Sequence, residues 1–158
     1  MSPRDPSSDI RMINVGGKPI TVRTARASGR LIATAETVEQ IRSGALAKGD
    51  PLATARVAGI MAAKKTADLV PLCHPLALTH VNIELTIELT GPAVYCRTTV
   101  ETHGQTGVEM EALTAVSVAA LTIYDMCKSH DREMVISDIC LLEKRGGKSG
   151  IYQRDRER

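Results

Sequence analysis

Polar and apolar residues alternate along two neighbouring segments in the middle of the chain. Every odd position from 81 to 89 is Val, Ile or Leu, and every even position from 94 to 100 is Val, Cys or Thr. A period of two is typical of a strand with one buried face. Gly91-Pro92 lies between the two segments and favours a turn. The pattern therefore predicts a β-hairpin over about residues 81–100.

Other segments place their apolar residues at helical spacing. Asp50 followed by Pro51 is a typical helix start, and the segment 53–65 then carries Val57, Ile60 and Met61. A short helix is predicted over 37–45 and a long one over 107–129. The short apolar segments 29–33 and 135–142 are predicted to be strands.

The long predicted helix carries charge only at its ends. Residues 112–124 are uncharged, Glu109 and Glu111 precede them, and Asp125 and Lys128 follow. The uncharged stretch is too short to span a bilayer and fits a buried helix better. It is apolar on more than one side, so a single sheet cannot cover it, and we expect a second subunit to cover the rest.

Apart from the short helix over 37–45, the predicted order is strand, helix, strand, strand, helix, strand. This order predicts an α+β, ferredoxin-like fold with two helices packed on one face of a four-stranded antiparallel sheet. The chain of 158 residues suits one domain, expected over 11–158, after a disordered N-terminus over 1–10. The basic, glycine-rich segment 144–150 is expected to form a C-terminal tail.

Composition narrows the choice of partners and compartment. Twenty Lys and Arg oppose eighteen Asp and Glu, and the three Tyr are the only aromatic residues, which disfavours nucleic-acid binding by base stacking. The four Cys show no Cys-x-x-Cys spacing, which favours reduced thiols in a cytosol. No signal peptide or membrane span is recognised. We expect a soluble cytoplasmic protein with no nucleic-acid or membrane partner.

The acids and bases at the two helix ends allow two interpretations. Asp125 and Lys128 are three residues apart and share a helix face, as an end-of-helix ion pair or as a proton-transferring pair. Glu109 and Glu111 could complement the helix dipole or bind a ligand. Glu111 and Asp125 are fourteen residues apart, roughly 21 Å along a helix. If both serve one reaction, a neighbouring chain must bring the other end.

Basic segments elsewhere suggest a site for a polyanion. His74 lies between Pro71 and Pro75, where it could bind an anion, move a proton or simply cap loop carbonyls. Lys48 precedes a helix start, where a phosphate could bind. Segment 144–150 lacks the spacing of a P-loop and could also be a solvated terminus. The Cys and His residues have no familiar zinc-ligand spacing.

Three segments, 64–76, 107–128 and 142–150, resemble the signature segments of the cyclic pyranopterin monophosphate synthase family, the molybdenum cofactor biosynthesis protein C family. The resemblance implies a phosphorus–oxygen lyase that converts (8S)-3′,8-cyclo-7,8-dihydroguanosine 5′-triphosphate into cyclic pyranopterin monophosphate and releases pyrophosphate. It implies a homohexamer, a trimer of dimers of ferredoxin-like subunits with sites at subunit interfaces. No cofactor is implied, although a divalent cation such as Mg²⁺ on the pyrophosphate is compatible with it.

Carried over by position, the resemblance assigns roles to individual residues. Asp125 and Lys128 match the catalytic acid and lysine. The substrate-binding positions and the candidate phosphate-binding cations are Leu72, Cys73, His74, Glu109, Met110, Glu111, Lys48, Lys64 and Lys144. The chain departs from the family at Asn14, where the family commonly has Asp. This difference bears only on a role for an acid at that position.

Two alternatives remain at this stage. A non-enzymatic ferredoxin-like module could use the same pocket to bind a nucleotide as a regulatory signal. An RNA-binding domain of the same architecture is disfavoured, because the strands lack the exposed aromatic residues on which bases stack.

Overall fold

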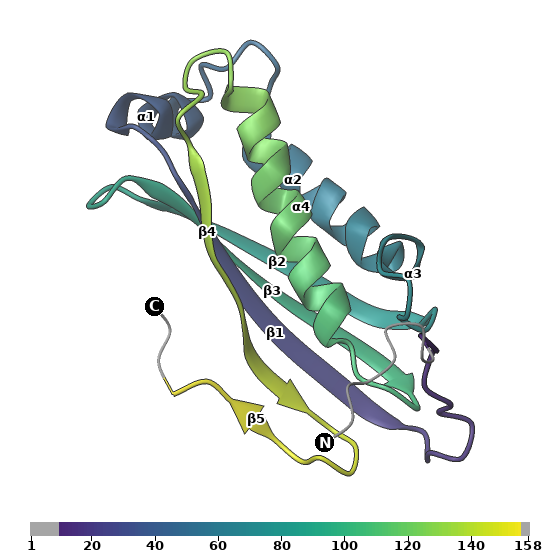
Figure 1. Cartoon of the computed structure of the whole chain (residues 1–158). Coiled ribbons are helices and arrows are strands. Elements are labelled where there is room, and N and C mark those ends of the chain that lie inside the picture. The colour runs from purple at the N-terminus through teal and green to yellow at the C-terminus, as the bar shows by residue number, and fades with distance from the viewer. Residues whose placement is uncertain (1–9, 156–158) are drawn as a thin grey trace, which may run out of the picture.

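The computed structural model describes residues 10–155 as one antiparallel sheet with helices (Figure 1). Residues 1–9 and 156–158 lie outside the described residues, and the disorder expected for 1–10 falls almost entirely on them. Along the chain the elements are β1 (Thr21–Ile32), α1 (Ala35–Ser43), α2 (Pro51–Lys64), α3 (Thr66–Leu69), β2 (Leu78–Glu88), β3 (Ala93–Gly104), α4 (Glu109–Cys127), β4 (Val135–Arg145) and β5 (Tyr152–Gln153).

The sheet has the strand order β2-β3-β1-β4-β5, and every neighbouring pair is antiparallel. Helices α2 and α4 lie side by side on one face of the sheet, and α1 lies near one end of it (Figure 1). The other face, called the open face below, is covered by no helix in the part of the chain that the structure describes. The α+β class is therefore confirmed.

The prediction of a four-stranded sheet was wrong, because the described residues form five strands. Gly146, Gly147 and Gly150 have positive φ angles of 97°, 78° and 68°, a backbone conformation that glycine adopts without strain. They turn the chain back after β4, so that Tyr152 and Gln153 pair with Lys144 and Glu143. The segment expected to be a tail is thus the turn of a small hairpin.

Strand β1 is also longer than the predicted strand 29–33. Its first half alternates Ala25 and Ala27, which are fully buried, with Thr24 and Arg26, which are partly exposed. Alanine is a weak hydrophobic signal in sequence, so the period of two is masked there. Strand β1 lies between β3 and β4 in the sheet, and α4 packs against its buried face. Small side chains on that face leave room for the helix.

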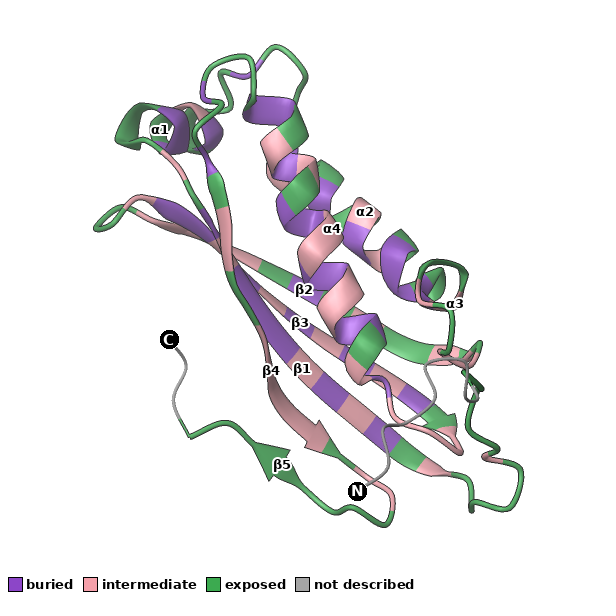
Figure 2. Cartoon of the chain, viewed as in Figure 1, coloured by how far each residue is buried: buried purple, intermediate pink, exposed green. Residues whose placement is uncertain are grey.

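Helix α4 is the centre of the core. Its buried residues, among them Ala112, Ala115, Val116, Ala119 and Ile123, face β1, β3, β4 and α2, and Figure 2 shows buried positions recurring along its length. It is the one helix among the described residues that is long and apolar enough to cross a membrane, but half of that stretch is buried inside the fold. This burial is typical of the core helix of a folded domain.

Close packing of α2 on α4 depends on a residue without a side chain. A Cβ atom at Gly59 would lie 2.3 Å from Ile83 Cδ1 and 3.0 Å from the Ala115 carbonyl oxygen. The two helices approach so closely because only glycine leaves that space. The packing holds the two ends of α2 beside the two ends of α4.

The loop after α4 is tied to α1 by a buried carboxylate. Asp131 Oδ2 accepts hydrogen bonds from the Thr34 N–H (3.0 Å) and the Thr37 hydroxyl (3.3 Å), and Oδ1 accepts one from the Glu133 N–H (3.0 Å). Thr34 is itself the N-cap of α1. These bonds fix the chain directly beyond the last turn of α4.

Candidate active site

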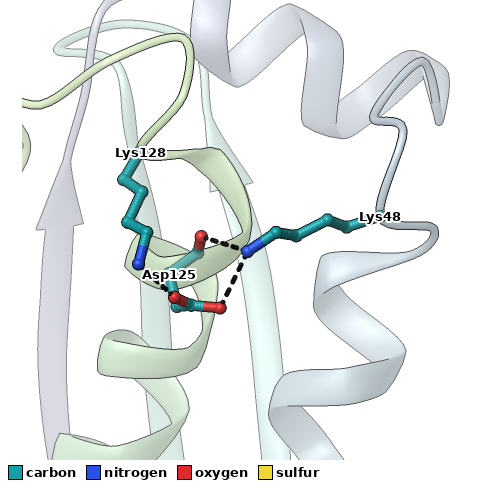
Figure 3. Close-up of polar contacts among 3 residues, drawn as sticks. All are labelled: Lys48, Asp125 and Lys128. Carbon is teal, nitrogen blue, oxygen red and sulfur yellow. Dashed lines mark hydrogen bonds and ion pairs between the residues drawn. The ribbon is translucent and has the colours of Figure 1, made fainter.

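The candidate site residues gather at the two ends of α4. At its C-terminal end, Lys128 Nζ donates to Asp125 Oδ1 at 2.6 Å (Figure 3). Lys48, from the loop between α1 and α2, donates to Asp125 Oδ2 at 3.0 Å and to the Asp125 carbonyl oxygen at 3.1 Å. Asp125 therefore lies between two ammonium groups that come from segments far apart in the sequence.

These two cations decide the charge of Asp125. The hydrogen bond from Lys128, then that from Lys48, holds the pKa of the Asp125 carboxyl below its usual value, so the carboxylate is ionised at neutral pH. The three side chains are exposed by 51–54%, and exposed ion pairs add little to stability. An accessible carboxylate between two ammonium groups is also suited to proton transfer and anion binding.

At the N-terminal end of α4 there is a pocket of about 340 Å³. Three segments form its wall: the chain before β1, the loop between α3 and β2, and the start of α4. Its lining residues are Arg11, Ile13, Val15, Lys18, Leu72, Cys73, His74, Leu76, Thr106, Gly107, Glu109, Met110 and Glu111. The volume lies in the range of small-molecule sites.

Glu111 is the buried acid of this pocket, with 4% of its surface exposed. Burial raises the pKa of Glu111 above its usual value, and the negative charge of Glu109 raises it further. Burial also raises the pKa of the Cys73 thiol, and the nearby Glu111 adds to this shift. Glu111 therefore holds a proton more readily than an exposed glutamate, and Cys73 is held as a thiol.

His74 is fixed by the chain that precedes β1. Its Nε2 atom lies 2.7 Å from the Ile13 carbonyl oxygen, and because a carbonyl can only accept, Nε2 carries the hydrogen. This is the carbonyl-capping interaction considered from the sequence. It does not remove His74 from the pocket, which the ring also lines.

A smaller basic pocket of about 150 Å³ adjoins the first and shares Lys18, Thr106, Gly107 and Glu109 with it. Lys144 Nζ lies 3.5 Å from Glu109 Oε1 and donates to the Ser149 hydroxyl. The buried Arg23 donates to the carbonyl oxygens of Gly104 and Gln105. A Cβ at Gly146 would lie 2.3 Å from the Val22 carbonyl oxygen, so this turn can pack against β1 only with glycine there.

The structure therefore places the sequence-predicted residues in two separate groups. Six of them line the larger pocket, namely Leu72, Cys73, His74, Glu109, Met110 and Glu111, and Lys144 lines the smaller one. Lys48 joins Asp125 and Lys128 at the other end of α4. Lys64 is exposed at the end of α2 and lines neither pocket.

Sequence reasoning missed several pocket residues, notably Arg11, Lys18, Arg23 and Thr106. Arg11, Lys18 and Arg23 lie outside any recognisable motif. Thr106 directly precedes the signature segment 107–128, and this position was the available signal for it. Asn14 is not among the lining residues. Its Oδ1 accepts the Gly16 N–H at 2.9 Å, a turn that aspartate makes equally well, so the change from Asp to Asn preserves the local structure.

No group of three or more His, Cys, Asp or Glu side chains in residues 10–155 is arranged to hold a metal ion. The four cysteines are unpaired.

Comparison with known proteins places these features in a family. The model of the MoaC family matches residues 12–147, a span that includes both groups of candidate site residues. The chain belongs to the MoaC family.

Curated relatives resemble the chain over nearly its whole length. The cyclic pyranopterin monophosphate synthase of Heliobacterium modesticaldum is 56% identical over 151 residues, covering 96% of this chain and 95% of the relative. The protein of that name from Chloroflexus aurantiacus is 55% identical over 152 residues, covering 96% and 93%. Cyclic pyranopterin monophosphate synthase 1 of Mycobacterium bovis is 56% identical over 150 residues, covering 95% and 88%.

Proposed function

We propose that this MoaC family chain is a cyclic pyranopterin monophosphate synthase of molybdenum cofactor biosynthesis. As a phosphorus–oxygen lyase it would convert (8S)-3′,8-cyclo-7,8-dihydroguanosine 5′-triphosphate into cyclic pyranopterin monophosphate and pyrophosphate. The proposal is supported by the names of relatives that share more than half of its residues. The observation that carries it is the exposed carboxylate of Asp125 held between Lys48 and Lys128.

The two adjoining pockets suit the two parts of this substrate. The larger pocket offers apolar contact from Leu72 and Met110 beside the acids Glu109 and Glu111, and would bind the purine-derived rings. The smaller pocket brings Lys18, Arg23 and Lys144 together, and would bind phosphate groups. Lys64 lines neither pocket, so its proposed role as a cation for the phosphates rests on the resemblance alone.

Asp125 and Lys128 are proposed to transfer protons. The conversion opens a five-membered ring, builds a pyrazine and cyclises a phosphate, and these changes need proton transfer rather than electron transfer. The ionised Asp125 can accept a proton, and the ammonium groups of Lys128 and Lys48 can donate one or stabilise negative charge on a leaving phosphate. We propose no cofactor, with a divalent cation on the pyrophosphate as the one addition that the chemistry allows.

We further propose a cytoplasmic homohexamer, a trimer of dimers with sites at subunit interfaces. Helix α4 separates Glu111 from Asp125 by fourteen residues, roughly 21 Å, so a site that uses both draws them from two chains. Exposed apolar residues on α2 and α4, such as Val57, Met61 and Leu121, provide a surface for such contact. The core formed by β1-α2-β2-β3-α4-β4 is proposed to be ferredoxin-like.

Product analysis tests the proposed activity. The purified chain is incubated with the cyclised dihydro-GTP, and pyrophosphate and cyclic pyranopterin monophosphate are quantified. We expect both products in equal amounts. If the substrate binds but no pyrophosphate forms, the chain is instead a nucleotide-binding module without turnover, and the proposed function is wrong.

A further inference from the structure

The open face of the sheet carries a cavity that belongs to neither group of candidate site residues. It has a volume of about 290 Å³ and is lined by Arg26, Arg97, Leu142, Glu143, Gln153 and Arg154. Arg26 aligns with Glu143, and Glu143 with Gln153, so the cavity crosses β1, β4 and β5 in register. The cavity exists because the glycine turn after β4 folds the chain back to form β5.

Positive charge dominates this cavity. Three of its lining residues are arginines, and Glu143, its one carboxylate, is already bound by Arg145 through both oxygens. Arg26 is only partly exposed, and its guanidinium makes no hydrogen bond or ion pair within residues 10–155. A half-buried guanidinium without a partner carries a desolvation cost that an anion would offset.

The other two arginines are held in position. Arg154 donates its backbone N–H to the Leu142 carbonyl at 2.8 Å and its Nε to the Leu141 carbonyl at 2.9 Å. Arg97 donates to the Tyr95 hydroxyl and lies over the Tyr95 ring, and Glu84 faces it from β2. Arg26 and Arg154 therefore supply most of the uncompensated charge.

We propose that this cavity is a second anion site, which binds a diphosphate group. Arginine forks suit phosphate oxygens. Arg26 lies on β1 and Arg154 directly follows β5. These two strands are two positions apart in the sheet, about 10 Å, a span wider than one phosphate. The same chemistry fits free pyrophosphate and the diphosphate of a nucleotide. The inference does not depend on the proposed function, because it uses none of the candidate active-site residues.

Calorimetry with full-length protein tests the site. The starting protein is a Lys144→Gln variant, in which binding to the basic pocket beside α4 is weakened. Inorganic pyrophosphate, GDP and inorganic phosphate are titrated separately into this variant. The same titrations are repeated after Arg26→Gln or Arg154→Gln is added to it. Each added change should weaken pyrophosphate binding about tenfold or more. Tighter binding of GDP than of pyrophosphate would identify the nucleotide as the ligand, and the reverse would identify the free anion. Phosphate should bind more weakly than either.

The matched control is Arg56→Gln, which removes an exposed arginine of α2. Arg154→Gln lies beyond the last strand and keeps the test valid if Arg26→Gln impairs folding. Binding as tight in both variants as in the Arg56→Gln control would overturn the proposal. The proposal would also be overturned if these variants kept the same pyrophosphate affinity but changed the mass of the assembly, measured by light scattering. The open face would then be a surface that contacts protein.

Discussion

Asp125 has the environment of a functional carboxylate, since the two ammonium groups around it are exposed and contribute little to stability. We predict that Asp125→Asn and Lys128→Ala each lower turnover by about 10²- to 10⁴-fold, the usual contribution of a general acid or base. Thermal unfolding should change little. The control is Glu39→Gln, which breaks another exposed pair with the same three-residue spacing. Normal turnover in either variant would leave the pair as an end-of-helix ion pair.

At Glu111, a substitution that removes the charge should raise the stability of the protein and lower its turnover. Its pKa is raised by burial, so the folded protein binds the proton more tightly than the unfolded chain does. Stability then falls as pH rises from the unfolded pKa of about 4.3 through the folded pKa. Glu111→Gln should therefore be more stable than the wild type at pH 7, and this advantage should shrink towards pH 4.

Urea unfolding between pH 4 and pH 8 measures this effect. The exposed Glu36→Gln serves as the control. Turnover by Glu111→Gln should fall although the protein is more stable, because the buried acid is part of the pocket. A stability difference that is constant across this pH range would contradict the assigned cause.

At the scale of elements, the contact of α2 with α4 and β2 determines how the two helix ends are aligned. Gly59→Ala places a Cβ against Ile83 Cδ1 and the Ala115 carbonyl oxygen. Overpacking costs about 1–3 kcal/mol, and the higher helix propensity of alanine returns roughly 1 kcal/mol. We predict a net loss of up to about 2 kcal/mol in the free energy of unfolding.

The double variant Gly59→Ala/Ile83→Val tests the cause, because valine lacks the Cδ1 atom. Ile83→Val alone should cost about 0.5–1.5 kcal/mol. In the double variant the two losses should be less than additive. Full additivity would mean that the added methyl group finds room without contacting Ile83.

At the scale of the whole molecule, the separation of the two residue groups predicts shared sites. Glu111→Ala and Asp125→Asn proteins, each inactive alone, should recover activity when they are dissociated, mixed and reassembled. A mixed dimer can then hold one site with both defects and one site with neither. Preparations of a single variant treated in the same way are the control. If subunit exchange is demonstrated and no activity returns, both residues act within one chain or in different processes.

The amino-acid sequence by itself determined the hairpin, the start of α2 at Asp50-Pro51, and the long apolar helix with charged ends. Each follows from local spacing, because side-chain periodicity and helix capping depend on residues a few positions apart. The set of candidate residues around Leu72–His74 and Glu109–Glu111 came from the resemblance of single short segments to a known family.

Only the tertiary structure decided which of these segments meet. Lys48 contacts Asp125 across 77 positions, and Lys18, Arg23 and Lys144 come together through the turn at Gly146. Strand β5 and the full length of β1 were missed because alanines and a glycine-rich turn give weak periodic signals. Pairing between distant strands and helices depends on the complementary shape of the packed elements, and spacing along the chain contains no direct record of it.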